Sequence, residues 1–319
     1  MTILVGDIGG TNARLALVKD ASLKLEHMQT LPTQSFASFD EAVLTYLQRL
    51  DVKPSKACFA VAAPINDERV SFTNNPWSFS VAELRLQLNI QDIRVINDFE
   101  AMARCLPHLK AADVTKVGGG QVKASQTKAI LGPGTGLGMA ALLEDQNGVY
   151  HPLATEGGHA RFAASNEREW ALSKVLEKRD GFVSNESLLS GQGLINIRWA
   201  LSQLDGKGVS PVSAAQICEA AIHKTEDVSV EAFQIFWAVL GSVAGDYAMQ
   251  TGALGGVYIS GGIAPRYMSA LNDSDFRSRF EAKGDYRSYL EGIATFVVSA
   301  DQPGLIGAAA VFENEGEAR

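Results

Sequence analysis

Two glycine-rich turns carry the residue types that bind phosphate. The first is Gly6-Asp7-Ile8-Gly9-Gly10-Thr11-Asn12, and the second is Gly132-Pro133-Gly134-Thr135-Gly136-Leu137-Gly138. Each lies between two short apolar runs, which predicts a strand, a turn and a second strand, with backbone N–H groups exposed at the tip of the hairpin. A single turn of this kind is equally compatible with a tight hairpin that binds nothing. Two of them, one holding Asp7 and both holding a threonine, favour a duplicated ATPase core whose two tips grip one nucleotide triphosphate.

The glycine spacing does not match two other nucleotide-binding motifs. A Walker loop ends in Gly-Lys-Ser/Thr ahead of a helix, whereas Gly206-Lys207 is followed by Gly208. A dinucleotide-binding turn spaces its glycines one and then two residues apart, whereas the glycines at 132, 134, 136 and 138 alternate as in a strand. The Walker-loop and dinucleotide-binding interpretations are therefore rejected.

A third chemical feature is the pair Asn97-Asp98, which follows an apolar run and precedes a helical pattern. In open α/β sheets, ligands bind at the carboxyl ends of the strands. Phosphoryl transfer to a hydroxyl needs a group that accepts the hydroxyl proton, and a carboxylate in this position suits that task. The pattern alone leaves two interpretations of Asp98 open: a general base, or the N-cap of the helix that begins near Phe99.

The elements that must position these residues alternate between helix and strand. Ser38 with Glu41 and Ser80 with Glu83 form capping-box patterns, which predict helices starting near Phe39 and Val81. Strands are predicted over 56–62, 70–73, 93–96 and 293–298, and helices over 230–248 and 304–311. The apolar face of helix 230–248 is expected in the core. The polar stretch 110–128 is the predicted boundary between a small domain, residues 1–108 with 301–319, and a large domain, residues 109–300.

Charge and cysteine content restrict the classes of function. The 319 residues include 28 Lys and Arg and 36 Asp and Glu, so the formal charge is 28 minus 36, or −8. An acidic chain of this kind predicts no nucleic-acid partner. Cys58, Cys105 and Cys218 lie far apart and form no CxxC pair, which favours a reducing, cytoplasmic compartment over a disulfide framework or a zinc site. The longest uncharged run, 247–265, holds five glycines, so no membrane span is expected.

Seven motifs follow one another along the chain in a recognisable order. They are Gly6 to Leu17, Ile96-Asn97-Asp98-Phe99, Gly134 to Gly138, Glu156-Gly157-Gly158-His159, Leu189-Ser190-Gly191, Ser260-Gly261-Gly262-Ile263 and Pro303-Gly304-Leu305. This ordered set resembles the bacterial glucokinase family, in its zinc-free branch, over essentially the whole chain. The resemblance implies the α/β, duplicated actin-like (ribonuclease-H-like) ATPase fold, with two domains and a cleft between them. It also implies a homodimer that uses ATP and Mg²⁺ to phosphorylate the 6-hydroxyl of glucose, the entry step of glycolysis.

The resemblance further implies roles for individual residues. For glucose it implies the ligands Asn74, Asn97, Asp98, Glu156, His159 and Glu186, with Asp98 as the catalytic base. For the nucleotide it implies Gly6, Asp7, Ile8, Gly9, Gly10, Thr11, Asn12, Gly134, Thr135 and Gly136 at the phosphates, and Gly261 and Gly262 at the adenosine. Asp7 is expected near Mg²⁺, with water between them. Without the resemblance, residues 156–159 fit a surface turn, and Glu186 fits a helix-surface charge near a Ser184 N-cap.

Two alternative functions stay open. An actin-like or chaperone-like ATPase that switches partner binding would explain both glycine-rich hairpins, but not the set of Glu156, His159 and Glu186. A kinase for another hexose or for an amino sugar would explain all of them. The chain departs from some relatives at Ala160-Arg161 and at Gln192, which flank the sugar motifs, so selectivity among hexoses stays open.

Overall fold

The computed structural model describes residues 2–19, 23–63, 69–72 and 77–313. Contacts within the chain divide it into two compact units. Unit 1 comprises Met1–Lys110, Asp145–Ala154 and Ala300–Arg319, and unit 2 comprises Ala111–Glu144 and Thr155–Ser299. The short segment 145–154 therefore belongs to unit 1, whereas the predicted boundaries place it in the large domain. The units are defined by contacts, so the predicted boundaries of the two folding domains stay a prediction.

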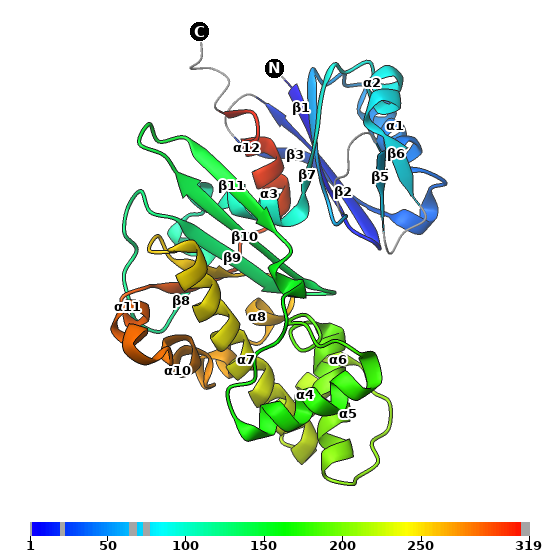
Figure 1. Cartoon of the computed structure of the whole chain (residues 1–319). Coiled ribbons are helices and arrows are strands. Elements are labelled where there is room, and N and C mark those ends of the chain that lie inside the picture. Colours follow the sequence, from blue (N-terminus) through cyan, green and yellow to red (C-terminus); the bar gives the residue numbers. More distant parts are fainter. Residues whose placement is uncertain (1, 20–22, 64–68, 73–76, 314–319) are drawn as a thin grey trace. The chain divides into compact units, whose positions relative to one another are not determined.

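Unit 1 is built on a five-stranded sheet of order β3-β2-β1-β4-β7 (Figure 1). β1, β2 and β3 are antiparallel neighbours, whereas β4 runs parallel to β1 and β7 parallel to β4. The strands are β1 (Thr2–Ile8), β2 (Asn12–Lys19), β3 (Leu25–Pro32), β4 (Lys56–Val61) and β7 (Asp92–Asn97), with a separate two-stranded sheet of β5 (Arg69–Ser71) and β6 (Ser78–Ser80).

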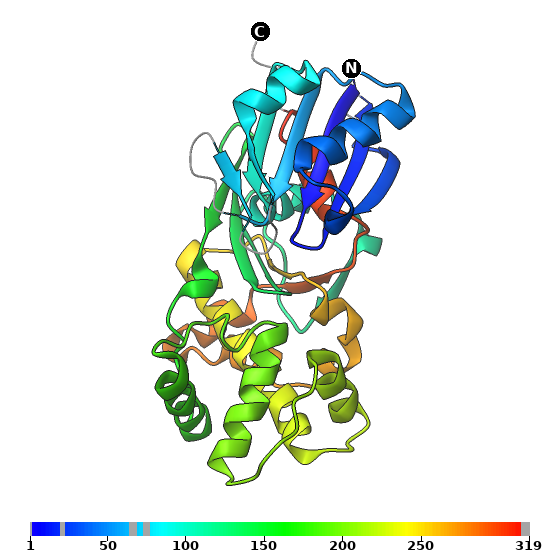
Figure 2. The ribbon, with the colours of Figure 1, turned by 90° about the vertical axis from the view of Figure 1, so that its right-hand side faces the viewer.

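Helices cover both faces of the unit 1 sheet, as Figures 1 and 2 show. Successive side chains of β1 point to opposite faces, as strand geometry requires. On one face, Leu4 and Ile8 pack in one core with α1 (Phe39–Leu50) and α2 (Val81–Leu88). On the other, Ile3 and Val5 pack in a second core with α3 (Asp98–Cys105) and α12 (Pro303–Ala310). The 3-10 turns of this unit are η2 (Thr33–Ser35) and η3 (Leu106–His108).

The predicted helix starts in unit 1 are confirmed. The Ser38 and Ser80 side chains accept hydrogen bonds from the N–H groups of Glu41 and Glu83, which fixes the first turns of α1 and α2. The reciprocal half of the capping box differs in α1, because the Glu41 carboxylate accepts from Ala37 N–H rather than from the N-cap residue itself. β5 begins at Arg69, one residue before the predicted strand 70–73, and residue 73 lies outside the described residues.

The second sheet repeats the strand pattern of the first. Its order is β11-β10-β9-β12-β13-β8, where β9 and β10 form an antiparallel hairpin and β12 and β13 continue the sheet in parallel. The hairpin β1–β2 followed by β4 and β7 has the same arrangement, so the predicted duplication is confirmed. The strands are β8 (Val114–Val117), β9 (Lys128–Pro133), β10 (Leu137–Glu144), β11 (Tyr150–Thr155), β12 (Val257–Ile259) and β13 (Thr295–Val298).

The core of unit 2 forms around the long helix α7 (Asp227–Thr251). The predicted apolar face is buried, including Phe233, Trp237, Leu240 and Ala244. By length and composition α7 could cross a membrane, but 72% of its most apolar window is buried inside the protein, as in a core helix. The other helices are α4 (Glu167–Asp180), α5 (Gly191–Leu204), α6 (Ala214–Ile222), α8 (Ile263–Arg266), α9 (Met268–Asn272), α10 (Phe276–Glu281) and α11 (Arg287–Glu291), with 3-10 turns η4 (Ala111–Asp113), η5 (Gly157–His159) and η6 (Gly284–Tyr286).

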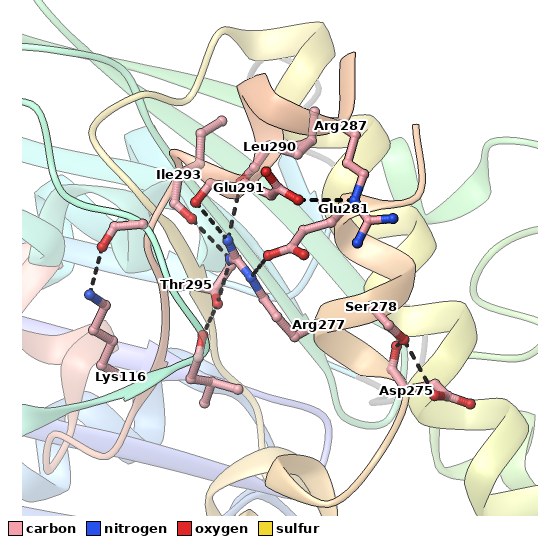
Figure 3. Close-up of polar contacts among 12 residues, drawn as sticks. Lys116, Asp275, Arg277, Ser278, Glu281, Arg287, Leu290, Glu291, Ile293 and Thr295 are labelled. Atoms are coloured by element: carbon pink, nitrogen blue, oxygen red, sulfur yellow. Dashed lines mark hydrogen bonds and ion pairs between the residues drawn. The ribbon is translucent and has the colours of Figure 1, made fainter. Parts of the chain in front are cut away.

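In unit 2, one expected strand start is wrong, and the polar stretch contains elements that the sequence did not predict. The polar stretch 110–128 holds η4 and β8, and β8 pairs with β13 as the edge of the sheet. β13 begins at Thr295, two residues later than predicted, because Ile293 forms only an isolated bridge with Gln121. Arg277 of α10 holds this part of the chain (Figure 3): its guanidinium donates to the carbonyls of Leu290 at 3.1 Å and Ile293 at 2.9 Å.

Candidate functional site

The first glycine-rich turn is the tip of the β1–β2 hairpin. Gly9 N–H donates to the Asn12 carbonyl at 3.0 Å and closes the turn. A Cβ at residue 6 would lie 2.7 Å from the Phe59 ring, so the strand entering the turn needs a glycine. The buried Thr33 hydroxyl donates to the carbonyls of Gly10 at 3.0 Å and Thr11 at 3.1 Å. Thr33 therefore satisfies two backbone carbonyls of the turn by hydrogen bonding. The residue type of Thr33 did not predict this role.

Asp7 lies in this hairpin directly opposite Arg14. Arg14 Nη1 is 3.1 Å from Asp7 Oδ2, and the Asp7 side chain is 25% exposed. Burial raises the pKa of Asp7 above its usual value, and the Arg14 guanidinium opposes that rise. The start of α12 approaches from the same unit, because a Cβ at Gly304 would lie 3.2 Å from the Asp7 carboxyl carbon. Asp7 is thus a partly buried carboxylate held between an arginine and a helix start.

Asn97 and Asp98 lie at the carboxyl end of β7, where α3 begins, as the sequence predicts. Asn97 is the N-cap residue: its Oδ1 accepts from Phe99 N–H at 2.8 Å and from Glu100 N–H at 3.3 Å. Asp98 is the first residue of α3, and its Oδ1 accepts from Phe99 N–H at 2.9 Å. The capping function is therefore carried by Asn97, and the interpretation of Asp98 as the N-cap is wrong.

The three predicted sugar ligands of unit 2 come together. His159 lies between two carboxylates, with Nδ1 3.7 Å from Glu156 Oε2 and Nε2 3.7 Å from Glu186 Oε1. These separations are longer than hydrogen bonds. The side chains of Glu156 and His159 are 75% and 64% exposed, whereas that of Glu186 is 32% exposed. Two carboxylates and an imidazole that are not bound to one another can receive several hydroxyl groups at once.

Backbone contacts fix this group. Glu186 N–H donates to the Gly158 carbonyl at 2.9 Å, which joins residue 186 to the turn η5 that carries His159. Residues 181–190 contain no helix, so the interpretation of Glu186 as a helix-surface charge is wrong. Asn74, the remaining predicted sugar ligand, lies outside the described residues.

The second glycine-rich turn is the tip of the β9–β10 hairpin. Gly134 N–H donates to the Gly136 carbonyl at 2.8 Å and closes the turn. The Gly134 carbonyl accepts from Gly191 N–H at 2.8 Å, at the start of α5. On the other flank, Leu137 N–H donates to Glu186 Oε2 at 2.7 Å. The turn therefore adjoins both α5 and the three predicted sugar ligands of unit 2.

A cavity of about 480 Å³ opens beside this turn, within the volume range of small-molecule sites. Three predicted nucleotide residues line it, Gly134, Thr135 and Gly262, whereas Gly261 does not. Gly261 has a φ of +84°, and a Cβ there would overlap the Pro133 carbonyl, so its role is to shape the turn. The other lining residues were not predicted: Gly191, Leu194, Ala214, Ala215, Cys218, Ile263, Arg266 and Tyr267.

The wall of this cavity has a chemistry that suits a nucleoside. Ala214 and Ala215 leave space for a flat ring, Leu194 and Tyr267 supply apolar surface, and Arg266 supplies a cation. Burial raises the pKa of the Cys218 thiol to about 11, so at neutral pH this residue is an uncharged part of the wall. The wall residues come from α5, α6 and the α8–α9 region. Only their small size, seen in the run Ser213-Ala214-Ala215, could have pointed to them in the sequence.

The residues present suit a Mg²⁺ ion held mainly by substrate. Among the described residues, no three His, Cys, Asp or Glu side chains gather to form a metal cage. Mg²⁺ commonly binds through one or two carboxylates, substrate phosphates and water. Asp7 supplies a carboxylate at a phosphate-binding type of turn, and its burial disfavours an uncompensated negative charge. The donor set therefore fits the ion.

Comparison with known proteins identifies the family. A family model described as Glucokinase matches residues 4–315. A glucokinase of Hahella chejuensis is 42% identical over 313 residues, which cover 98% of this chain and 97% of that protein. The crystal structure of a glucokinase from an Antarctic psychrotroph has a TM-score of 0.89 at 38% identity and covers 98% of this chain and 99% of that one.

A more distant structure shares the fold. The ROK family glucokinase of Streptomyces griseus, solved in complex with glucose and AMPPNP, has a TM-score of 0.65 at 17% identity and covers 98% of this chain and 99% of that one. The predicted fold class, a duplicated actin-like ATPase fold, is confirmed by these neighbours and by the repeated sheets. On its sequence over 4–315 and on its fold, this chain belongs to the glucokinase family.

Proposed function

We propose that this chain transfers the γ-phosphoryl group of ATP to the 6-hydroxyl of D-glucose, giving glucose 6-phosphate and ADP at the entry to glycolysis. The observation that carries the proposal is the position of Glu186. Its carboxylate lies 3.7 Å from His159 in the predicted sugar site and accepts a hydrogen bond from Leu137 in the second glycine-rich turn. In unit 2 the proposed sugar ligands and the second glycine-rich turn are therefore immediate neighbours, an arrangement that supports a sugar kinase.

Sugar recognition is assigned to the group of Glu156, His159 and Glu186. The carboxylates accept hydrogen bonds from hydroxyls, and the imidazole donates or accepts according to its tautomer. Asn97 adds a donor from unit 1, because its Oδ1 is engaged in capping α3 and its amide NH₂ is the group suited to a hydroxyl. Asn74 completes the proposed set.

Asp98 is assigned as the general base. It accepts the proton of the 6-hydroxyl as that oxygen attacks the γ-phosphorus and the bond to the bridging oxygen breaks, so ADP leaves with the electron pair. Its position at the carboxyl end of β7 supports the role, as does the cap provided by Asn97, because Asp98 is not needed to cap α3. Phosphoryl transfer needs little further covalent help beyond alignment and charge neutralisation.

Nucleotide binding is assigned to the two turns and the cavity. Gly6 to Asn12 and Gly134 to Gly136 bind phosphates through backbone N–H groups, and the 480 Å³ cavity lined by Gly262 takes the adenosine. When bound, Mg²⁺ supplies positive charge that neutralises the phosphates. Asp7 would hold that ion through water.

A coupled assay of ADP release across a panel of sugars tests this function. With glucose we expect rapid ADP release that produces glucose 6-phosphate, and without sugar only slow hydrolysis. Equal rates with and without sugar would support the partner-switching ATPase. Faster release with an amino sugar or another hexose than with glucose would reassign the substrate.

We further propose a cytoplasmic homodimer that binds neither nucleic acid nor membrane. The charge of −8 and the burial of all three cysteines support a reduced protein without a polyanion partner. Homodimer formation rests on family membership alone. Light scattering during gel filtration tests it, and a mass of 34.1 kDa, that of one chain, would contradict it.

A further inference from the structure

The second phosphate turn is held on both flanks by one short segment of unit 2. At one flank, Gly191 N–H donates to the Gly134 carbonyl at 2.8 Å. At the other, Leu137 N–H donates to Glu186 Oε2 at 2.7 Å. The segment 186–191 therefore bridges the turn, and on the Leu137 flank the connection is made by a side chain rather than by backbone.

That side-chain connection is a strong one. A backbone N–H bound to a carboxylate is a charge-assisted hydrogen bond, which is shorter and stronger than a bond between neutral groups. Glu186 is only 32% exposed, so water competes for this bond less than at an open surface. The Leu137 carbonyl is also enclosed, because a Cβ at Gly158 would overlap it. The peptide groups of Leu137 are thus fixed by the residues that form the predicted sugar site.

Residue 136 must be a glycine because any larger side chain would clash with the Glu186 carboxylate. A Cβ at residue 136 would lie 2.5 Å from Glu186 Oε2 and 3.2 Å from its carboxyl carbon. Gly136 does not have a positive φ, so backbone conformation does not demand a glycine there. Gly134, in the same turn, differs: a Cβ on it would meet nothing within 4 Å. One glycine of the turn leaves room for Glu186, and the other faces open space.

We propose that Glu186 is a positioning residue for the second phosphate turn as well as a sugar ligand, and that Gly136 is required to seat it. The inference rests on the proposed function, since it gives the sugar ligand Glu186 a second role. One oxygen of the carboxylate, Oε2, holds the turn, and the other, Oε1, faces His159 and the sugar. A sugar hydroxyl that binds Oε1 fixes the carboxylate, and so fixes Leu137 and the turn. Sugar and nucleotide then strengthen each other's binding by the same factor, as thermodynamic linkage requires.

The proposal changes what a variant of Glu186 should do. A residue that only recognises sugar would leave nucleotide affinity unchanged when removed. Under the proposal, Glu186→Ala weakens both ligands, because Leu137 N–H loses its acceptor. Glu186→Gln separates the two roles: its amide oxygen can still accept from Leu137, while its amide nitrogen replaces the acceptor that faces the sugar.

The first experiment compares these two variants with the wild-type full chain. Hydrogen exchange of the Leu137 amide is measured without any ligand, and the affinities for glucose and for AMPPNP with Mg²⁺ are measured by calorimetry. In Glu186→Ala we expect Leu137 exchange to rise about tenfold or more and both affinities to fall about ten- to hundredfold. In Glu186→Gln glucose affinity should fall as well, but Leu137 exchange and AMPPNP affinity should change less than in Glu186→Ala, because the neutral amide oxygen still accepts a weaker hydrogen bond from Leu137.

The second experiment compares Gly136→Ala with its neighbour Gly134→Ala. The methyl at 136 displaces the Glu186 carboxylate, so glucose affinity measured without nucleotide should fall about tenfold or more. The methyl at 134 faces open space, so it should leave that affinity within about twofold while it weakens AMPPNP binding. If Gly136→Ala does not fold, the comparison of Glu186→Ala with Glu186→Gln is sufficient to test the positioning role of Glu186.

Unchanged Leu137 exchange in Glu186→Ala, or unchanged AMPPNP affinity there, would overturn the positioning role. Both outcomes leave the proposed function intact if the wild-type chain phosphorylates glucose. Failure of the wild-type chain to phosphorylate any sugar would instead refute the proposed function. The exchange of Leu137 would then still report whether Glu186 holds the turn.

Discussion

At the start of α3, two adjacent polar residues are both candidates for the helix cap, and the sequence pattern cannot separate them. Asn97 caps the helix through its side-chain oxygen, with bonds of 2.8 Å and 3.3 Å to the next N–H groups. Asp98 follows as the first residue of the helix. An aspartate and an asparagine cap equally well, so only the structure assigns the cap to Asn97.

Replacement of Asp98 by Asn should therefore impair chemistry far more than folding. Asp98→Asn keeps the shape of the side chain but removes its basicity, so turnover should fall about 10²- to 10⁴-fold. Glucose affinity measured by calorimetry should stay within about tenfold. If the variant kept more than a tenth of wild-type turnover, Asp98 would not be the base.

Ser80→Ala provides the matched control for helix capping in the same unit. The Ser80 side chain caps α2 by accepting from Glu83 N–H at 3.4 Å. Its removal should cost about 0.5–2 kcal/mol of unfolding free energy, with turnover unchanged. The contrast between the two variants separates a lost cap from a lost base.

Asp7 should cost the ligand-free protein stability at neutral pH. Burial raises the pKa of Asp7 above 3.8, and this effect exceeds the opposing Arg14 ion pair. The folded chain then holds the Asp7 proton more tightly than the unfolded chain, so the free energy of unfolding falls as pH rises from 3.8 through the raised pKa. Removal of the Asp7 charge should therefore restore the free energy of unfolding that is lost at neutral pH.

We therefore expect Asp7→Asn to raise Tm at pH 7 while turnover falls at least about a hundredfold, because the carboxylate that would hold Mg²⁺ through water is lost. The gain in Tm should shrink as the pH is lowered toward 3.8. Thermal unfolding at several pH values, without nucleotide or Mg²⁺, measures it. A lower Tm in Asp7→Asn at pH 7 would mean that the Arg14 ion pair outweighs the cost of burial.

The sequence predicted which residues of unit 2 come together as proposed sugar ligands better than how they are held. Glu156 and His159 are three residues apart in a Gly-Gly turn, so the motif itself brings them close together. The bond from Leu137 to Glu186 spans 49 residues and joins a backbone N–H to a carboxylate. Such a contact leaves no trace in residue type or spacing, so only the fold could reveal it.

Among the elements, α12 carries two glycines on one face with separate neighbours. Gly304 lies against the Asp7 carboxylate, and a Cβ at Gly307 would overlap the Ala101 carbonyl of α3. The backbones of α12 and α3 therefore approach closely, and α3 is the helix whose first residue is Asp98. This close packing of α12 against α3 helps to fix the two carboxylates of unit 1, Asp98, the proposed base, and Asp7, the proposed Mg²⁺ residue.

Gly307→Ala should force α3 and α12 apart. Overpacking of this kind costs about 1–3 kcal/mol of unfolding free energy. Because the movement reaches Asp98, turnover should fall by a larger factor than glucose affinity does. Denaturant unfolding and steady-state kinetics measure the two effects. Gly208→Ala is the control: a Cβ there meets nothing within 4 Å, so stability should change by less than about 0.5 kcal/mol.

Elements with strong local signals were predicted, and those defined by distant partners were not. Ser38 and Ser80 mark the starts of α1 and α2 through capping that acts within one helical turn. β8 is only four residues long, two of them exposed, and it is a strand because β13 pairs with it. Its sequence, Val-Thr-Lys-Val, reads as part of a polar connection. Pairing across 178 residues, as between Thr295 and Val117, cannot be read from it.

For the whole molecule, the two glycine-rich hairpins predicted the duplication correctly. Each hairpin is followed by two strands that continue its sheet in parallel. The division into units was less predictable, because the ten residues Asp145–Ala154 group with unit 1 although they come from the middle of the chain. Which unit a segment belongs to depends on its contacts with distant residues, and local composition does not predict those contacts.

The position of α12 has a consequence for biosynthesis. Leu305 and Ala308 belong to the same core as Ile3 and Val5, yet about 190 residues, including all of unit 2, separate Lys110 from Pro303. At about 5–20 residues per second, translation leaves that face of the first sheet without α12, and so covered by α3 alone, for about 10–40 s. Ribosome-bound chains halted before residue 303 should therefore be cleaved by protease in unit 1 and protected in unit 2. Protection of unit 1 before α12 emerges would contradict this order. The strand that is synthesised first is thus expected to become protease-resistant last.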